Sequence, residues 1–198
     1  MREQLHVARA GLITEDNFRP IKNYPRIMLK PAMTGMWTST YDPTQEHMSD
    51  WIRYSMNENN SSMTGVKHVQ ILKPKKEARI LEVNLDVLEN VIYKKYMLEP
   101  VILKNNFLGD EWNANAHQID FEKLAQDYDA IHYIPGILTV GMDFLKAFEL
   151  RFENPFTAWD CESTLWFRWM FEDDVIIKKV NFPAFKDEPF DWDDWEEE

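Results

Sequence analysis

The chain has few of the residues on which several common site types depend. It contains one cysteine, Cys161, and six glycines among 198 residues. A disulfide within the chain is therefore excluded, and a reducing compartment is expected. Neither G-x-G-x-x-G nor a Walker loop occurs, which excludes phosphate-cradling nucleotide sites of those two types.

Long apolar runs are also missing. No uninterrupted run approaches the roughly 20 apolar residues that a membrane-spanning helix needs. The first residues lack the apolar core of a secretory signal. We therefore expect a soluble, cytoplasmic protein that does not bind membranes.

The sequence shows no metal-binding or cysteine-nucleophile motif. Its five histidines are dispersed and form no H-x-x-x-H pair, so we predict no metal site. Cys161 lies between two carboxylates, which would raise the pKa of its thiol and lower its reactivity as a nucleophile. These patterns argue against a metalloenzyme and a cysteine hydrolase.

Composition and charge favour one globular domain with an acidic surface. The chain is 44% hydrophobic and 14% aromatic, and its length suits a single core. We predict one domain over residues 1–183 and an acidic, aromatic tail over residues 184–198. The formal charge of −12 would repel phosphates, which argues against general coating of nucleic acid.

Short strand patterns alternate with a few amphipathic helices. Apolar, β-branched and aromatic runs predict strands over residues 5–10, 35–41, 66–72, 78–83, 130–134, 159–167 and 173–180. Helical spacing predicts helices over residues 49–56, 84–92, 120–128 and 143–152. The sequence predicts irregular connections over residues 14–32, 57–65 and 105–119. An alternative for the first connection includes a short strand over residues 26–29. The prediction is an α+β fold with mixed or antiparallel sheets and peripheral helices.

The strand predicted over residues 159–167 carries two acidic residues among aromatics. Alternation along a strand would put Asp160, Glu162 and Thr164 on one face. One interpretation is an edge strand whose carboxylates face water. The other is a site, because burying a carboxylate costs free energy unless the group has partners or a task.

The strand predicted over residues 35–41 carries three consecutive hydroxyls. Ser39 would share a face with Trp37 and Tyr41, and Thr38 and Thr40 would lie on the other face. The high strand propensity of threonine explains the pattern as well as a binding role does. His6 in the first predicted strand is likewise either an ordinary core residue with a satisfied hydrogen bond or part of a site.

The order of these stretches resembles the ADP-ribosyltransferase superfamily, in which a His or Arg strand comes first. A Ser-Thr-Ser type strand then precedes a helix, and a Gln/Glu/Asp-x-Glu strand comes late. The matching stretches are Leu5-His6-Val7, Trp37-Thr38-Ser39-Thr40-Tyr41 before Asp50-Trp51-Ile52, and Asp160-Cys161-Glu162. The likeness extends over about residues 3–180. Ser39 matches the family strand by register, and Asp160 stands where the family more often has Gln or Glu.

This resemblance implies that NAD is a substrate and that ADP-ribose is transferred to a protein or nucleic-acid target. Glu162 would stabilise the positive charge that develops on the ribose and would hold a ribose hydroxyl. Asp160 would accept a proton from the attacking target group. Glu162 and Asp160 are thus the implied catalytic residues.

Five residues would bind NAD in the same comparison. His6 would hydrogen-bond the adenosine ribose, and Ser39 would position either Glu162 or the nicotinamide amide. Tyr41 or Trp51 would stack on the nicotinamide ring. Thr38 belongs to the same hydroxyl-bearing strand and completes the set.

The alternative is a non-enzymatic acidic inhibitor, of phage or bacterial intracellular origin, that occupies a basic groove of a partner protein. In residues 187–198, eight of twelve residues are acidic, with Phe190, Trp192 and Trp195 between them. Such a segment is either a solvated tail or an anchor for a protein partner. An enzyme requires His6, Ser39 and Glu162 to line one cleft, whereas an inhibitor requires only a continuous acidic face.

Overall fold

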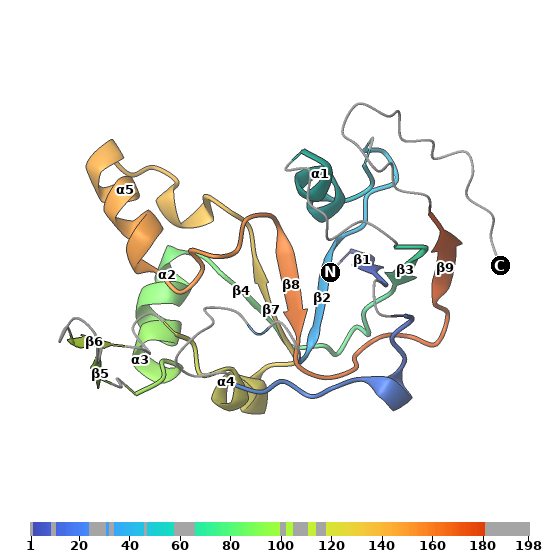
Figure 1. Cartoon of the computed structure of the whole chain (residues 1–198), viewed down its shortest axis with the longest axis horizontal. Helices are drawn as coiled ribbons and strands as arrows, with labels where there is room; N and C mark the ends of the chain where they lie inside the picture. The colour runs from blue at the N-terminus through green and yellow to red at the C-terminus, as the bar shows by residue number, and fades with distance from the viewer. Residues whose placement is uncertain are drawn as a thin grey trace.

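A mixed sheet of seven strands is the framework of the protein (Figure 1). The computed structural model describes residues 2–8, 11–23, 31, 34–45, 47–57, 66–99, 102–104, 111–113 and 118–180. In these ranges the strand order is β4-β7-β8-β2-β1-β3-β9, and β5 and β6 form a separate two-stranded sheet. Together with the surrounding helices, this sheet confirms the predicted α+β class.

The strands are short, and all neighbouring pairs are antiparallel except β4 and β7, which are parallel. The strands of the main sheet are β1 (Gln4–Val7), β2 (Met36–Thr40), β3 (His68–Leu72), β4 (Ile80–Glu82), β7 (Ala130–Tyr133), β8 (Ser163–Trp166) and β9 (Ile176–Lys179). The small sheet consists of β5 (Ile102–Lys104) and β6 (Glu111–Asn113). Strands that follow each other in sequence can thus lie far apart, since β3 and β4 belong to opposite halves of the main sheet.

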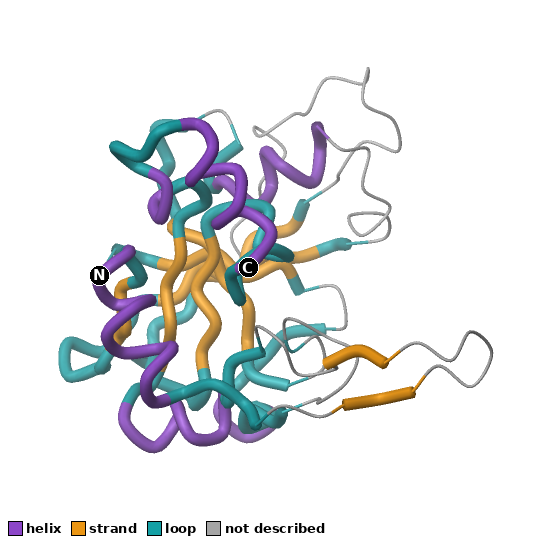
Figure 2. The backbone as a smooth tube through the Cα atoms, turned by 90° about the vertical axis from the view of Figure 1, so that its left-hand side faces the viewer, coloured by secondary structure: helices purple, strands orange, loops and turns teal. Residues whose placement is uncertain are grey.

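Side chains cap the N-termini of two of the helical segments. Asn84 accepts a hydrogen bond from the Val87 amide, and Asp120 accepts one from the Lys123 amide. The helical segments are η1 (Glu15–Asn17), α1 (Asp50–Asn57), α2 (Leu85–Val87), η3 (Leu88–Ile92), α3 (Tyr93–Lys95), α4 (Phe121–Asp127), η4 (Ile137–Thr139) and α5 (Phe144–Glu153). In Figure 2 the helical turns lie above and below the central strands.

The core consists of three apolar clusters around the sheet. The largest joins buried residues of β4, β7 and β8 to α4 and η3, for example Leu165, Leu124 and Ile92. A second places Ile52 of α1 against Leu5 of β1. A third cluster contains Met36, Leu72, Ala130, Trp166 and Phe171. The helical segments α1, α4 and η3 therefore pack against the sheet.

Three local predictions were wrong in part. The strand expected over residues 159–167 begins only at Ser163, because the chain bends at Cys161. Residues 105–119 were expected to be a loop but contain β6. Helical spacing over residues 143–152 predicts that Phe144 and Leu145 lie on the apolar side of that helix. They are instead 79% and 71% exposed, because no described element covers this end of α5.

Some predictions lie outside the described residues. These are the optional strand at 26–29, most of the loop at 57–65 and the tail at 184–198. Within the described ranges, none of the helices is both long enough and apolar enough to cross a membrane.

Candidate functional site

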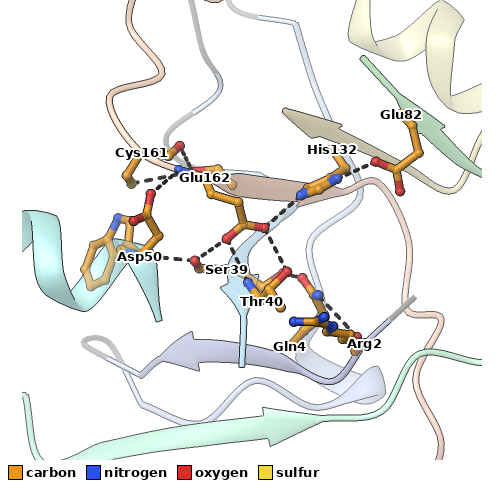
Figure 3. Close-up of polar contacts among 12 residues, drawn as sticks. Arg2, Gln4, Ser39, Thr40, Asp50, Glu82, His132, Cys161 and Glu162 are labelled. Carbon is orange, nitrogen blue, oxygen red and sulfur yellow. Dashed lines mark hydrogen bonds and ion pairs between the residues drawn. The ribbon is translucent and has the colours of Figure 1, made fainter. Parts of the chain in front are cut away.

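The carboxylate of Glu162 is the centre of a buried polar network (Figure 3). Glu162 is 9% exposed and accepts four hydrogen bonds. One oxygen, Oε2, accepts from the Ser39 hydroxyl and, at 2.8 Å, from the Thr40 amide. The other, Oε1, accepts from the Thr40 hydroxyl at 3.0 Å and pairs with His132 Nε2 at 2.8 Å. These contacts compensate the desolvation of a carboxylate.

The end of the β2–β8 ladder explains why Glu162 can bind here. The paired register of these strands ends where Thr38 faces Thr164, so Glu162 comes just before β8 and beside the last residues of β2. The Thr40 amide therefore bonds the Glu162 side chain instead of a strand carbonyl. The carboxylate continues the connection between the two strands beyond their backbone ladder.

Helix α1 fixes the same segment from its N-terminal end. Asp50 accepts a hydrogen bond from the Glu162 amide at 2.9 Å, and the Trp51 amide donates to the Ser39 hydroxyl at 3.4 Å. An N-terminal carboxylate also suits the dipole of the helix. Ser39 is thus held between the first turn of α1 and Glu162.

His132 connects Glu162 to Glu82. Its Nε2 faces Glu162, and its Nδ1 makes a short contact with the Glu82 carboxylate. The strand registers explain the alignment, because His132 lies directly opposite Glu82 of β4 on one side and Thr164 of β8 on the other. Side chains directly opposite each other in neighbouring strands share one face of the sheet.

Charge states follow from this arrangement. Burial acts to raise the pKa of Glu162, but hydrogen bonds from His132, Ser39 and Thr40 outweigh it, so the pKa is lowered. Burial acts to lower the pKa of His132, but the bonds to Glu162 and Glu82 outweigh it and raise the pKa from 6.5 to about 9. At neutral pH the network therefore contains an anionic Glu162 and a cationic His132.

The structure brings together only part of the residue set predicted for NAD. Ser39 contacts Glu162 directly, as stated above. Thr38 instead donates to Gln4 at 2.7 Å and accepts from the Trp166 indole at 3.0 Å, so its hydroxyl is used inside the core. His6 Nδ1 bonds the Trp37 carbonyl at 2.8 Å, and burial lowers the pKa of this histidine.

The two aromatic residues proposed to stack on nicotinamide pack elsewhere. Tyr41 and Trp51 are partly buried against the cluster around Leu5 and Ile52. Trp51 reaches the Glu162 network through its backbone amide. No contact that the structure gives for these two side chains joins them to Glu162.

Asp160 is separated from Glu162 by the bend at Cys161. It is exposed and lines a cavity of about 510 Å³, which Glu162 does not line. Aromatic residues of this cavity are Tyr54, Tyr133, Phe144, Phe156 and Trp159. The expectation that Asp160 and Glu162 share one strand face was wrong, because these residues precede the strand.

The Cys161 thiol is buried, with its sulfur 3.7 Å from the Ser163 hydroxyl. Among the residues that the structure describes, no group of three or more His, Cys, Asp or Glu side chains could hold a metal ion.

Sequence reasoning missed four members of the network. They are Thr40, Asp50, Glu82 and His132. The sequence placed His132 and Glu82 in strands, and a polar residue inside each short apolar strand was the available signal. Their partnership depends on the parallel pairing of β4 with β7, which no local pattern specifies.

The fold and the network define an α+β protein with a buried, ionised carboxylate at the junction of two strands. No family model, curated protein or solved structure matches the chain. Function must therefore be inferred from the geometry itself.

Proposed function

We propose that the protein is an NAD-dependent ADP-ribosyltransferase that modifies a protein or nucleic-acid target. The observation that carries this proposal is the direct bond between Ser39 and Glu162. The resemblance assigned these residues to the hydroxyl-bearing strand and to the late acidic stretch. In the sheet, β2 lies between β1, the strand of His6, and β8, which follows Glu162.

The ionisation of Glu162 suits the reaction. Transfer breaks the bond between the ribose C1′ and the nicotinamide nitrogen, and the bonding electrons leave with nicotinamide. Positive charge develops on the ribose, and a fixed anion nearby stabilises it. Glu162 is such an anion, and its position is fixed by Ser39, Thr40 and His132.

Asp160 supplies the second function that the reaction requires. An oxygen or nitrogen atom of the target forms a bond to C1′, and its proton passes to the Asp160 carboxylate. Asp160 is exposed, so a large target can reach it. The neighbouring cavity of about 510 Å³ falls in the usual range for ligand sites, and its aromatic side chains can contact the nicotinamide ring.

Substrate access requires a rearrangement at Glu162. All four hydrogen bonds to the carboxylate come from the protein, and the side chain is 12% exposed. A ribose hydroxyl of NAD replaces the Thr40 hydroxyl at Oε1, while Ser39 and the Thr40 amide retain Oε2. The exchange leaves the number of hydrogen bonds at Glu162 unchanged.

The test is NAD binding and cleavage by the purified full chain. Nicotinamide release is measured by chromatography, and transfer is measured with labelled NAD in a cell extract. We expect cleavage by the wild type, near-complete loss in Glu162→Gln, and no change in Glu89→Gln, an exposed matched control. Circular dichroism checks that Glu162→Gln is folded. Absence of NAD binding at millimolar concentration would contradict the proposal.

A second candidate is the acidic, non-enzymatic inhibitor of a protein with a basic groove. The formal charge of −12 favours it, and so do three exposed apolar side chains near η4 and α5. Val140, Phe144 and Leu145 are 75%, 79% and 71% exposed. Exposed apolar side chains of this kind can anchor a protein interface. Capture of a basic partner without NAD cleavage would favour this candidate.

A further inference from the structure

His132 lies between two carboxylates that differ in exposure. The Glu82 side chain is 63% exposed, whereas those of His132 and Glu162 are 11% and 12% exposed. The three residues thus form a line from the surface to the buried centre of the network (Figure 3). Glu162 is the only one of the two carboxylates that also contacts β2.

Both ring nitrogens of His132 face carboxylate oxygens. The Nε2–Oε1 distance to Glu162 is 2.8 Å, and Nδ1 contacts Glu82. A neutral imidazole carries one N–H and can donate to only one of them. Simultaneous bonds to two ionised carboxylates therefore require the imidazolium, with one proton on each nitrogen.

The surroundings of His132 contain no other charged partner in the part of the chain described. Its ion pairs are with Glu82 from β4 and Glu162 from the segment before β8. Thr164 of β8 lies directly opposite it, and the Thr40 hydroxyl of β2 shares Oε1 of Glu162 with it. Its protonation is thus set by the two carboxylates and by burial.

We propose that His132 is a positioning residue that keeps Glu162 ionised and oriented, and that Glu82 holds the His132 ring in place. The catalytic part of this proposal rests on the proposed transferase function. His132 fixes one oxygen of Glu162 on the sheet side, and Ser39 fixes the other on the α1 side. The carboxylate can then neither rotate nor take up a proton at neutral pH.

The first test needs no enzymatic activity. In full-length protein with labelled histidine and glutamate, NMR follows the His132 ring nitrogens and the Glu162 carboxyl carbon against pH. We expect both His132 nitrogens to be protonated at pH 7 in the wild type. We also expect the Glu162 titration to move to higher pH in His132→Gln, to move less in Glu82→Gln, and to stay unchanged in His68→Gln, the control.

Two NMR results would overturn the proposal. One is a neutral His132 ring in the wild type at pH 7. The other is a Glu162 titration that is the same in folded His132→Gln as in the wild type. If His132→Gln does not fold, the Glu82→Gln variant tests the proposal instead, because the Glu82 side chain is largely exposed. This replacement must lower the titration midpoint of His132, and an unchanged midpoint would overturn the proposal.

The second test uses turnover. If the wild type cleaves NAD, we expect His132→Gln to lower kcat about tenfold or more at an unchanged KM. The acidic limb of its pH–rate profile should move to higher pH. An unchanged kcat and profile would overturn the catalytic part. If the wild type does not cleave NAD, the transferase function fails, and the NMR titration alone still decides whether His132 controls Glu162.

Discussion

The hydroxyl of Ser39 donates a hydrogen bond to the carboxylate of Glu162, although 123 residues separate them in the chain. The bond joins β2 to the segment before β8 just beyond the end of their backbone ladder. It also holds the first turn of α1, because the Trp51 amide donates to the same hydroxyl. Removing the Ser39 hydroxyl oxygen therefore weakens contacts among β2, the segment before β8 and α1.

Replacing Ser39 by Ala should destabilise the protein. A hydrogen bond to a charged group contributes about 1.5–3 kcal/mol, and the loss leaves buried Glu162 with one donor fewer. Unfolding in urea measures the change. Ser55→Ala is the control, because the Ser55 hydroxyl is buried with no partner in the described residues, and its removal should change stability by no more than about 0.5 kcal/mol. Equal stability of the two variants would contradict the role of Ser39.

Stability should fall as the pH rises from 6.5 to 9. The pKa of His132 is raised to about 9 when the protein is folded, so its contribution is complete below 6.5 and is lost as the pH rises through 9. A shift of this size corresponds to about 3 kcal/mol at most. Urea unfolding at several pH values in the wild type and His132→Gln measures the difference in stability, whose pH-dependent part should be lost near pH 10.

Glu162 and His6 are among the groups that change stability on the acidic side. The lowered pKa of Glu162 means that its contribution is present above 4.5 and is lost as the pH falls below that value. Burial lowers the pKa of His6, so protonation opposes folding as the pH falls below 6.5. Both effects occur at or below pH 6.5, so the loss of stability between pH 6.5 and 9 reports on His132. Parallel pH curves for the wild type and His132→Gln would contradict the prediction.

Gly35→Ala should be strongly destabilising. Gly35 has a φ of +69°, and a Cβ at this position would lie 2.7 Å from the Trp166 carbonyl oxygen. This clash would force β2 away from β8, because the contacted atom belongs to the backbone of β8 and cannot move as a flexible side chain would. Thermal unfolding should show a larger loss than in Gly136→Ala, whose φ is +84° but whose Cβ would meet nothing within 4 Å. Gly136→Ala should therefore lose only the free energy of backbone strain, about 1–2 kcal/mol.

Asp160→Asn should lower transfer to the target far more than it lowers stability. Asp160 is exposed, so the substitution removes no buried group, but the amide cannot accept the proton of the target. We expect a decrease of about a hundredfold or more in transfer, with NAD binding retained. Labelled NAD and calorimetry measure the two quantities, and Asp173→Asn is an exposed control. Transfer at the rate of the wild type would remove Asp160 from the mechanism.

Local sequence patterns determined most of the elements. Helical spacing placed α1 within one residue, and α4 lies within the range predicted for it. The β-branched and aromatic run around Trp37 placed β2. These features depend on interactions between residues a few positions apart, so a single sequence contains the necessary information.

The tertiary structure alone decided the composition of the site. Glu162 and His132 come together because β7 and β8 pair in one register, and Glu82 joins them because β4 pairs with β7. A shift by one residue in either pair would turn these side chains to opposite faces. The bend at Cys161 likewise separates Asp160 from Glu162, although an uninterrupted strand would have kept them on one face. Strand register and the bend arise from contacts between distant segments, whereas the sequence specifies directly only the residues available for those contacts.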